Sequence, residues 1–80
     1  DDLRRLDCSD NQLTGLPKLP LVSLEILNLS NNNFTNAPIV KGYERLRELY
    51  LGGNQLTVVD KNDLPGNLRY IDIHVNYNVL

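Results

Sequence analysis

A nine-residue pattern, Leu-x-x-Leu-x-Leu-x-x-Asn, occurs four times in this chain of 80 residues. The four starts are spaced 21, 22 and 22 residues apart, and isoleucine or cysteine replaces leucine at a few positions. The matching residues are Leu3, Leu6, Cys8 and Asn11; Leu24, Leu27, Leu29 and Asn32; Leu46, Leu49, Leu51 and Asn54; and Leu68, Ile71, Ile73 and Asn76. Such matches in register indicate a repeat architecture in which each unit stacks on the next.

The Leu-x-Leu step of each repeat predicts a short strand. It alternates with a period of two, so its two apolar residues, such as Leu27 and Leu29, face the same side. Identical strands that are separated by a dozen or more residues can pair only in parallel, through a crossover connection. We therefore expect one strand per repeat, stacked into a coil with a single parallel sheet.

The asparagine that ends each pattern stands where the chain must turn away from the sheet. Backbone groups at this turn have no partner in the ladder of strands, and a carboxamide can both donate and accept hydrogen bonds. We expect the four asparagines to bond to the backbone of their own and neighbouring turns. The residues of this predicted asparagine ladder are Asn11, Asn32, Asn54 and Asn76.

The segments that return from one strand to the next show no sign of a long helix. Pro17 and Pro20 in the first return predict an extended path. In the second return, apolar residues recur at every third position from Phe34 to Leu46, which suits short 3₁₀ turns. The third return is polar around Pro65-Gly66, which signals a turn.

Taken together, the pattern, the strands and the returns resemble leucine-rich repeat proteins, and the resemblance covers essentially the whole chain. It implies an α/β-class leucine-rich repeat solenoid with short parallel strands on the concave face, extended or 3₁₀ returns on the convex face, and little or no regular α-helix. We expect a single array with repeats at about residues 3–23, 24–45, 46–67 and 68–80.

The subclass of repeat is open at this point. The Leu-Pro returns are similar to those of bacterial effector repeats, which we favour. The triplet spacing of the second return is similar to the intracellular eukaryotic subclass of about 22 residues. The run from Asn11 to Pro17 is similar to plant receptor repeats, which are slightly longer.

Both ends of the sequence adjoin a repeat directly, without a recognisable cap. Asp1 and Asp2 precede the first leucine, and the sequence stops at Asn78-Val79-Leu80, just past an asparagine turn. Terminal rungs of a solenoid need polar covers. We therefore expect a fragment of a longer array, or an array that another chain covers, with self-association through the uncapped ends as a further expectation.

Charge and hydropathy disfavour two classes of partner. The net charge is −2, and the lysines and arginines are scattered rather than gathered in a basic stripe, so we expect neither nucleic acid nor a membrane surface as partner. The hydrophobic content is 41% without a long apolar run, which predicts no transmembrane helix.

Cysteine usage bears on the compartment. Cys8 is the only cysteine, so no disulfide can form within the chain. It stands in a leucine position and is expected to pack as a small hydrophobe. An unpaired cysteine leads us to lean toward an intracellular or host-cell cytoplasmic location. The tripeptides Asn28-Leu29-Ser30 and Asn33-Phe34-Thr35 match the N-glycosylation pattern and keep an extracellular location open.

Candidate catalytic residues do not come together in the predicted coil. Cys8 points inward on the first rung, whereas His74 points outward on the fourth. Three rungs of about 4.8 Å each separate them by some 14 Å, so they cannot form a dyad. Gly52-Gly53 is too short for a phosphate loop and is expected to ease a turn. We expect no catalytic or metal site, no cofactor, and a chain that is not an enzyme by itself.

The outward strand positions form the candidate partner-binding surface. Two tyrosines and one isoleucine on otherwise polar rungs fit an interface with an apolar centre and a polar rim. An ordinary solvated sheet face is the alternative. The candidate residues are Arg5, Asp7, Ile26, Asn28, Glu48, Tyr50, Tyr70, Asp72 and His74.

The resemblance implies a non-catalytic protein–protein interaction module. It would bind a protein partner through the concave strand face, as part of a receptor or effector. A second hypothesis is the substrate-recognition segment of a larger enzyme or effector, such as a ubiquitin ligase, a kinase or a phosphatase. A third is a purely structural stacking unit.

Overall fold

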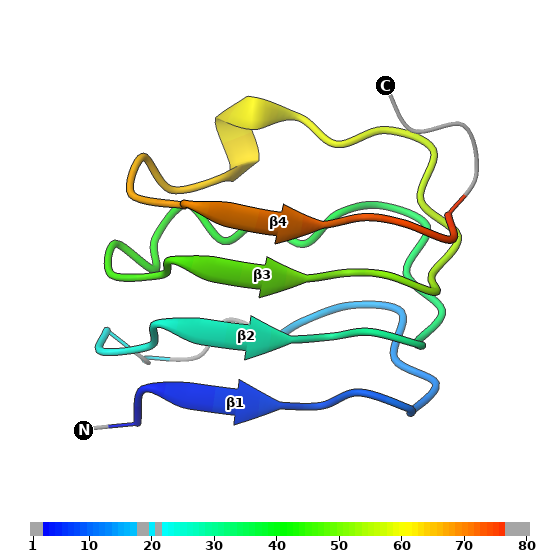
Figure 1. The fold of residues 1–80 in the computed structure, drawn as a ribbon, viewed down its shortest axis with the longest axis horizontal. Helices are drawn as coiled ribbons and strands as arrows, with labels where there is room; N and C mark the ends of the chain where they lie inside the picture. Colours follow the sequence, from blue (N-terminus) through cyan, green and yellow to red (C-terminus); the bar gives the residue numbers. More distant parts are fainter. Residues whose placement is uncertain (1–2, 18–19, 21, 77–80) are drawn as a thin grey trace.

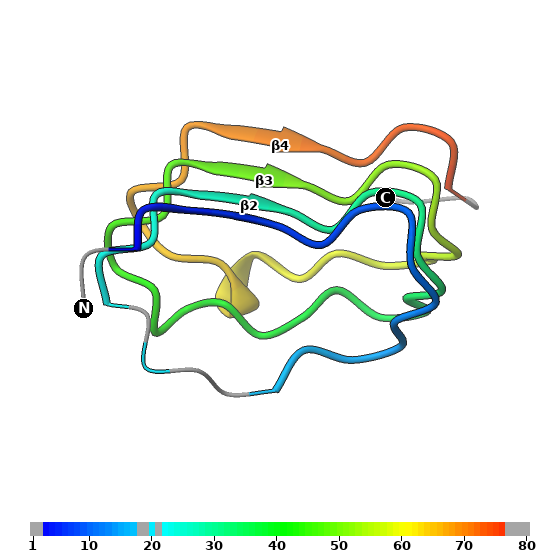
Figure 2. The same ribbon diagram turned by 90° about the horizontal axis from the view of Figure 1, so that it is seen from below.

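The computed structural model describes residues 3–17, 20 and 22–76, and this part of the chain winds into a coil with one short strand per turn (Figures 1 and 2). The strands are β1 (Arg5–Asp7), β2 (Ile26–Asn28), β3 (Glu48–Tyr50) and β4 (Tyr70–Asp72). They form one sheet in the order β1-β2-β3-β4, and each neighbouring pair is parallel. The predicted solenoid of short parallel strands is confirmed.

The strands pair in the same register across the whole sheet. Leu6 of β1 is the Cα partner of Leu27, and Leu49 is the partner of Ile71. Equal positions of successive repeats therefore lie side by side and form columns across the sheet. A residue type that recurs at one position of the repeat becomes a continuous strip of surface or core.

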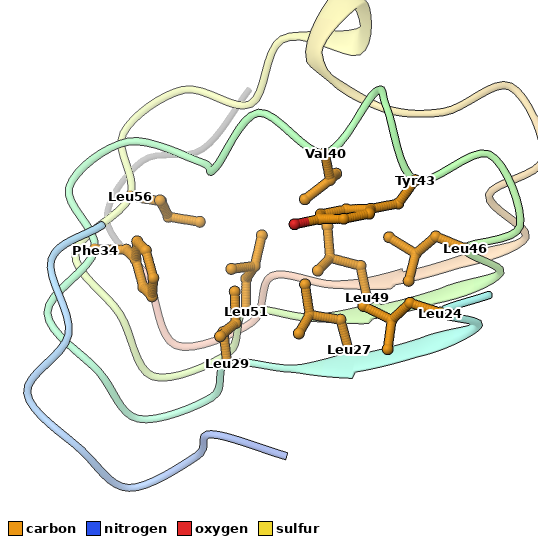
Figure 3. Close-up of a cluster of buried hydrophobic side chains, with 10 residues drawn as sticks. All are labelled: Leu24, Leu27, Leu29, Phe34, Val40, Tyr43, Leu46, Leu49, Leu51 and Leu56. Atoms are coloured by element: carbon orange, nitrogen blue, oxygen red, sulfur yellow. The ribbon is translucent and has the colours of Figure 1, made fainter. Parts of the chain in front are cut away.

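An apolar core fills the space between the sheet and the returning segments (Figure 3). Leu27 and Leu49 of the inner strands are 0% exposed, as expected for the inward face of a sheet covered by returns. Phe34 and Leu56 enter the core from the returns after β2 and β3. The buried hydrophobic residues are Leu24, Leu27, Leu29, Phe34, Val40, Tyr43, Leu46, Leu49, Leu51 and Leu56.

The outer rungs are less well covered than the inner ones. Leu6 of β1 and Ile71 of β4, with Cys8 and Ile73 just after these strands, are only half-buried although they occupy inward positions. Each outer rung has a strand neighbour on one side only within the described part of the chain. Complete burial of a large apolar side chain contributes about 1.5–3 kcal/mol, and contacts among the described residues supply only part of that burial at the outer rungs.

The predicted asparagine ladder is present. The Oδ1 atom of Asn32 accepts a hydrogen bond from the backbone N–H of Leu13 at 3.0 Å, and Asn76 accepts one from Leu56 at 2.9 Å. The Nδ2 atom of each donates to carbonyl groups of its own turn and of the preceding rung. Asn11 differs because it is exposed and donates only within its own turn, to Cys8 and Ser9.

The second return forms the expected short turns, each closed by a hydrogen bond between residues three apart. A 3₁₀ helix forms instead in the third return. Hydrogen bonds from Tyr43 N–H to the Val40 carbonyl and from Leu46 N–H to the Tyr43 carbonyl, each 3.0 Å, close two single turns. The 3₁₀ helix η1 spans Lys61–Asp63 in the third return. Asp60 caps it by accepting a hydrogen bond from the Asn62 N–H at 2.9 Å.

Within the described residues, the only helical element in the returns is η1, and no return forms a long helix. The predicted extended path between Pro17 and Pro20 includes residues 18–19, which lie outside the described residues. Within the described part of the chain, no helix has the length and apolar character to cross a membrane.

Candidate partner-binding surface

The sheet face that points away from the core carries two columns of candidate residues. Figure 2 shows this face on the far side of the sheet from the returning segments. Register pairing aligns the third positions of the repeats in one column and the fifth positions in the other. The third-position column is Arg5, Ile26, Glu48 and Tyr70, and the fifth-position column is Asp7, Asn28, Tyr50 and Asp72.

Two tyrosines from neighbouring strands are in contact on this face. The ring centroids of Tyr50 and Tyr70 lie 5.4 Å apart with an interplanar angle of 50°, a favourable tilted arrangement. Tyr70 is 51% exposed, whereas Tyr50 is half-buried. The structure therefore brings together the two aromatic residues that the sequence analysis singled out, and they present apolar surface to solvent.

Glu48 completes this aromatic group. The hydroxyl of Tyr50 donates a hydrogen bond of 2.6 Å to the Oε1 atom of Glu48. This hydrogen bond, together with burial and the nearby negative charge, raises the pKa of Tyr50 above its ordinary value. We call Glu48, Tyr50 and Tyr70 the tyrosine cluster. The hydrogen bond from Tyr50 restrains the side chain of Glu48, which therefore does not rotate freely in solvent.

Three candidate residues of the fifth-position column have a local structural role. The side chains of Asp7, Asn28 and Asp72 each accept a hydrogen bond from the backbone N–H two residues ahead, at 2.9, 3.0 and 3.1 Å. These Asx turns satisfy a backbone group at the point where each strand ends. The recurrence of Asp or Asn at this position was the sequence signal for this role, which the sequence analysis missed.

The two aspartates among these residues have carboxyl groups whose pKa is lowered by their neighbours. The hydroxyl and the backbone N–H of Ser9 both donate to Asp7 and lower the pKa of its carboxyl group. His74 lowers the pKa of Asp72, since its imidazole Nδ1 and its backbone N–H both contact the same carboxylate. Both carboxylates can therefore present negative charge to a partner.

His74 lies outside the strands but belongs to the same face. Its ring packs over Gly52 of the neighbouring rung, where a Cβ atom would come within 3.0 Å of the imidazole Cε1. The side chain is exposed, on the side of the sheet opposite the inward-pointing Cys8. The structure thus keeps the chain's histidine and cysteine on opposite sides of the sheet, as the sequence predicted.

A column of left-handed residues precedes the asparagine ladder, and the sequence analysis did not identify it. The φ angles are 59° at Asp10, 57° at Asn31, 71° at Gly53 and 53° at Val75. Asp, Asn and Gly tolerate this region better than other residues, whereas a β-branched residue is strained there. The expected turn at Gly52-Gly53 is thus one member of a turn that recurs in every repeat.

Charged residues at the second repeat position form a further column, at the edge where the strands begin. Glu25 bonds to Arg47 through a contact of 2.8 Å and lies 3.9 Å from Arg4. Arg45 and Arg69 line an open hollow beside this pair. Scattered charges in the sequence therefore gather into a mixed, mainly basic edge because equal positions stack.

This face combines three kinds of exposed side chain. It carries exposed aromatic area and two carboxylates on the strands, with arginines at the edge where the strands begin. Within the described residues, no group of three or more His, Cys, Asp or Glu side chains could hold a metal ion.

Comparison with protein-family models gives two matches. Residues 1–41 match the model described as "Leucine Rich repeats (2 copies)", and residues 45–66 match the model described as "Leucine Rich Repeat". Together these segments contain the first three strands of the sheet.

Several animal proteins are similar in sequence. Protein toll of Drosophila melanogaster is 37% identical over 78 residues, which is 90% of this chain and 7% of the relative. Leucine-rich repeat-containing G-protein coupled receptor 5 of Xenopus tropicalis is 42% identical over 66 residues, 80% of this chain and 7% of the relative. Transforming growth factor beta activator LRRC32 of Mus musculus is 48% identical over 70 residues, 82% of this chain and 11% of the relative. The chain thus spans only a small part of each relative's length.

Proposed function

This chain belongs to the leucine-rich repeat family, and on that premise we propose that it is a protein-binding module whose contact surface is the outward strand face. The tyrosine cluster is the proposed centre of the contact. Arg5, Asp7 and Ile26 extend the surface toward β1, and Asp72 and His74 extend it beyond β3. The partner is a protein that covers several rungs at once.

The observation that supports this proposal is the exposed contact between Tyr50 and Tyr70. Aromatic side chains supply a large contact area and lose little rotational freedom on binding, so they often carry much of the binding energy at protein interfaces. Here they lie within polar columns, which corresponds to an apolar centre with a polar rim. The relatives with receptor names agree with an interaction role.

Alanine variants of the two tyrosines test the proposal. The binding titration uses a protein partner that is first isolated by affinity purification on this chain. Tyr50→Ala and Tyr70→Ala should each weaken binding by about 2 kcal/mol or more, roughly 30-fold in Kd. Lys61→Ala, on the exposed helix η1 of the returning side, should leave Kd unchanged. Circular dichroism confirms that each variant is folded. If Lys61→Ala weakens binding and neither tyrosine variant does, the contact lies on the convex side.

We also propose that the module acts by binding and not by catalysis. Cys8 packs against the core and His74 faces the opposite side of the sheet, so neither supports the other as a nucleophile or base.

The compartment is a proposal as well. The receptor names among the relatives favour an extracellular array over the intracellular location expected from the single cysteine. The same relatives are animal proteins, so they give no support to the bacterial type of repeat.

Self-association through the outer rungs forms part of the proposal. Leu6 and Ile71 are half-buried at inward positions of the outermost strands, so contact between the two ends of the coil would cover apolar surface. Sedimentation velocity at several concentrations measures this. A sedimentation coefficient that does not change with concentration would contradict it.

A further inference from the structure

The two tripeptides that match the N-glycosylation pattern occupy different settings in the fold. Asn28-Leu29-Ser30 begins at the last residue of β2, whereas Asn33-Phe34-Thr35 lies at the start of the second return. We propose that the folded chain carries an N-linked glycan at Asn33 and none at Asn28. This modification site is independent of the proposed binding surface.

Asn28 is poorly placed to carry a glycan. It is half-buried in an inner strand, with Asp7 and Tyr50 as its Cα partners on the two neighbouring strands. Neighbouring strands are only about 4.8 Å apart, so a substituted sugar ring on Nδ2 would press against both side chains. Its Oδ1 atom also holds the Ser30 backbone N–H at 3.0 Å, which restrains the side chain against the strand end.

Asn33 offers the opposite setting. Asn33 and Thr35 are both exposed, while Phe34 between them is 1% exposed and points into the core. The asparagine and the hydroxyl residue of the tripeptide therefore face solvent on the same side. Within the described residues, the Asn33 side chain makes no hydrogen bond that a glycan would break.

The backbone around Asn33 is held firmly and its neighbours are compatible with a glycan. The N–H of Asn33 donates to the Leu13 carbonyl at 2.8 Å, and the N–H of Phe34 donates to Asn54 Oδ1 at 3.0 Å. The flanking rungs place the exposed, uncharged Gln12 and Gln55 beside the site. A glycan at this position leaves the core and the backbone hydrogen bonds of the turn intact.

The chemistry requires a sugar donor from outside the chain. The Nδ2 atom of Asn33 attacks the anomeric carbon of an oligosaccharide that is carried on a lipid pyrophosphate. A bond forms between nitrogen and the anomeric carbon, the bond between that carbon and the pyrophosphate oxygen breaks, and the amide nitrogen loses one proton. The lipid pyrophosphate leaves, and a membrane-bound transferase of the secretory pathway catalyses the exchange.

Paired variants that each remove one hydroxyl group test the assignment. The full chain is secreted from mammalian cells behind a cleavable signal peptide, and its intact mass is measured before and after treatment with peptide N-glycosidase. Thr35→Ala removes the signal at Asn33, and Ser30→Ala removes the signal at Asn28 but keeps the Asx turn of Asn28. Circular dichroism checks that the secreted proteins are folded.

We expect one glycan on the parent chain and on Ser30→Ala, and none on Thr35→Ala. Asn33→Gln should also abolish the mass shift, and peptide mapping should find aspartate at position 33 after enzymatic release. Glycans at both asparagines, loss of the shift in Ser30→Ala alone, or secretion of an unmodified parent chain would each overturn the proposal. None of these results depends on whether the tyrosine cluster binds a partner.

Discussion

The Oδ1 atom of Asn54 accepts a hydrogen bond of 3.0 Å from the backbone N–H of Phe34, which lies 20 residues earlier in the chain. Its Nδ2 atom donates to the carbonyl of Leu29 at 3.1 Å and to that of Leu51 at 2.9 Å. The carboxamide is almost completely buried, with 5% exposure. One side chain therefore satisfies backbone groups of two successive rungs that water cannot reach.

Removal of this carboxamide should destabilise the fold. Asn54→Ala leaves buried backbone groups without partners, and we expect the free energy of unfolding to fall by about 1–3 kcal/mol. Urea denaturation followed by circular dichroism measures the loss. Asn36→Ala is the matched control because Asn36 is exposed, and its free energy of unfolding should stay within about 0.5 kcal/mol of the unsubstituted chain. Equal midpoints for both variants would contradict the structural role of the ladder.

Relief of backbone strain at Val75 should stabilise the chain. Val75 has φ 53°, and the equivalent position in the second repeat is occupied by Asn31 with φ 57°. Because a β-branched residue is disfavoured in this region, we expect Val75→Asn to raise the free energy of unfolding by about 1 kcal/mol. Thermal and urea unfolding measure the gain.

The control for Val75 is a second exposed valine. Val58 is 59% exposed and Val75 is 72% exposed, but Val58 does not have a positive φ. Val58→Asn should therefore leave stability nearly unchanged. If the two variants shift the melting temperature by the same amount, relief of strain is not the cause.

Inner and outer rungs should respond differently to the same core truncation. Leu49 is 0% exposed between two strand neighbours, whereas Leu6 occupies the matching position of β1 and is half-buried. We expect Leu49→Ala to cost about 2–5 kcal/mol through lost burial and a residual cavity. Leu6→Ala should cost roughly half as much or less because its surroundings are already open to water. An equal or larger loss at Leu6 in urea denaturation would mean that the outer rung is covered in solution.

The hydrogen bond between Tyr50 and Glu48 should appear in the alkaline titration. It raises the pKa of Tyr50 above the ordinary value of 10.0, because the folded state holds the phenolic proton more tightly than the unfolded state does. Its contribution to stability is therefore complete below pH 10 and is lost as the pH rises through the folded pKa. Ultraviolet absorbance of the phenolate measures this ionisation, and subtraction of the Tyr50→Phe titration isolates the residue.

Substitution of the glutamate should reverse the shift. Glu48→Gln removes the negative charge and should lower the pKa of Tyr50 toward 10.0. Glu44→Gln is the control because Glu44 is exposed and does not contribute to the shift of Tyr50. A Tyr50 titration that is the same in all three proteins would show that the hydrogen bond is absent in solution.

Features that depend on the repeat period could be predicted well from the sequence. The strands, their parallel order and the inward positions follow from the alternation of apolar residues within each repeat and from the spacing between repeats. The asparagine ladder follows from the need to satisfy backbone groups at a fixed point of every turn. The outward positions of Tyr50 and Tyr70 also follow from the repeat, and the structure adds that their rings are in contact across adjacent strands.

Features that depend on backbone torsion or on local hydrogen bonds were missed. The left-handed residues, such as Asn31 and Val75, share no residue type, so no sequence pattern marks their column. The helix at Lys61–Asp63 forms because Asp60 caps a polar segment, whereas the apolar triplet of the second return forms separate turns. These outcomes depend on local hydrogen bonds that compete at similar energies.

By itself, the sequence determined that this protein is a coil of short parallel strands, because a period of two within repeats of constant length leaves one efficient way to bury the leucines. Only the tertiary structure decided what the outward face presents. Stacking in register placed Arg47 against Glu25 and the His74 ring over Gly52, and it left Asn33 exposed but Asn28 between two strands. The physical reason is that burial is set by the repeat as a whole, whereas surface contacts arise between side chains about 22 residues apart that only the register brings together.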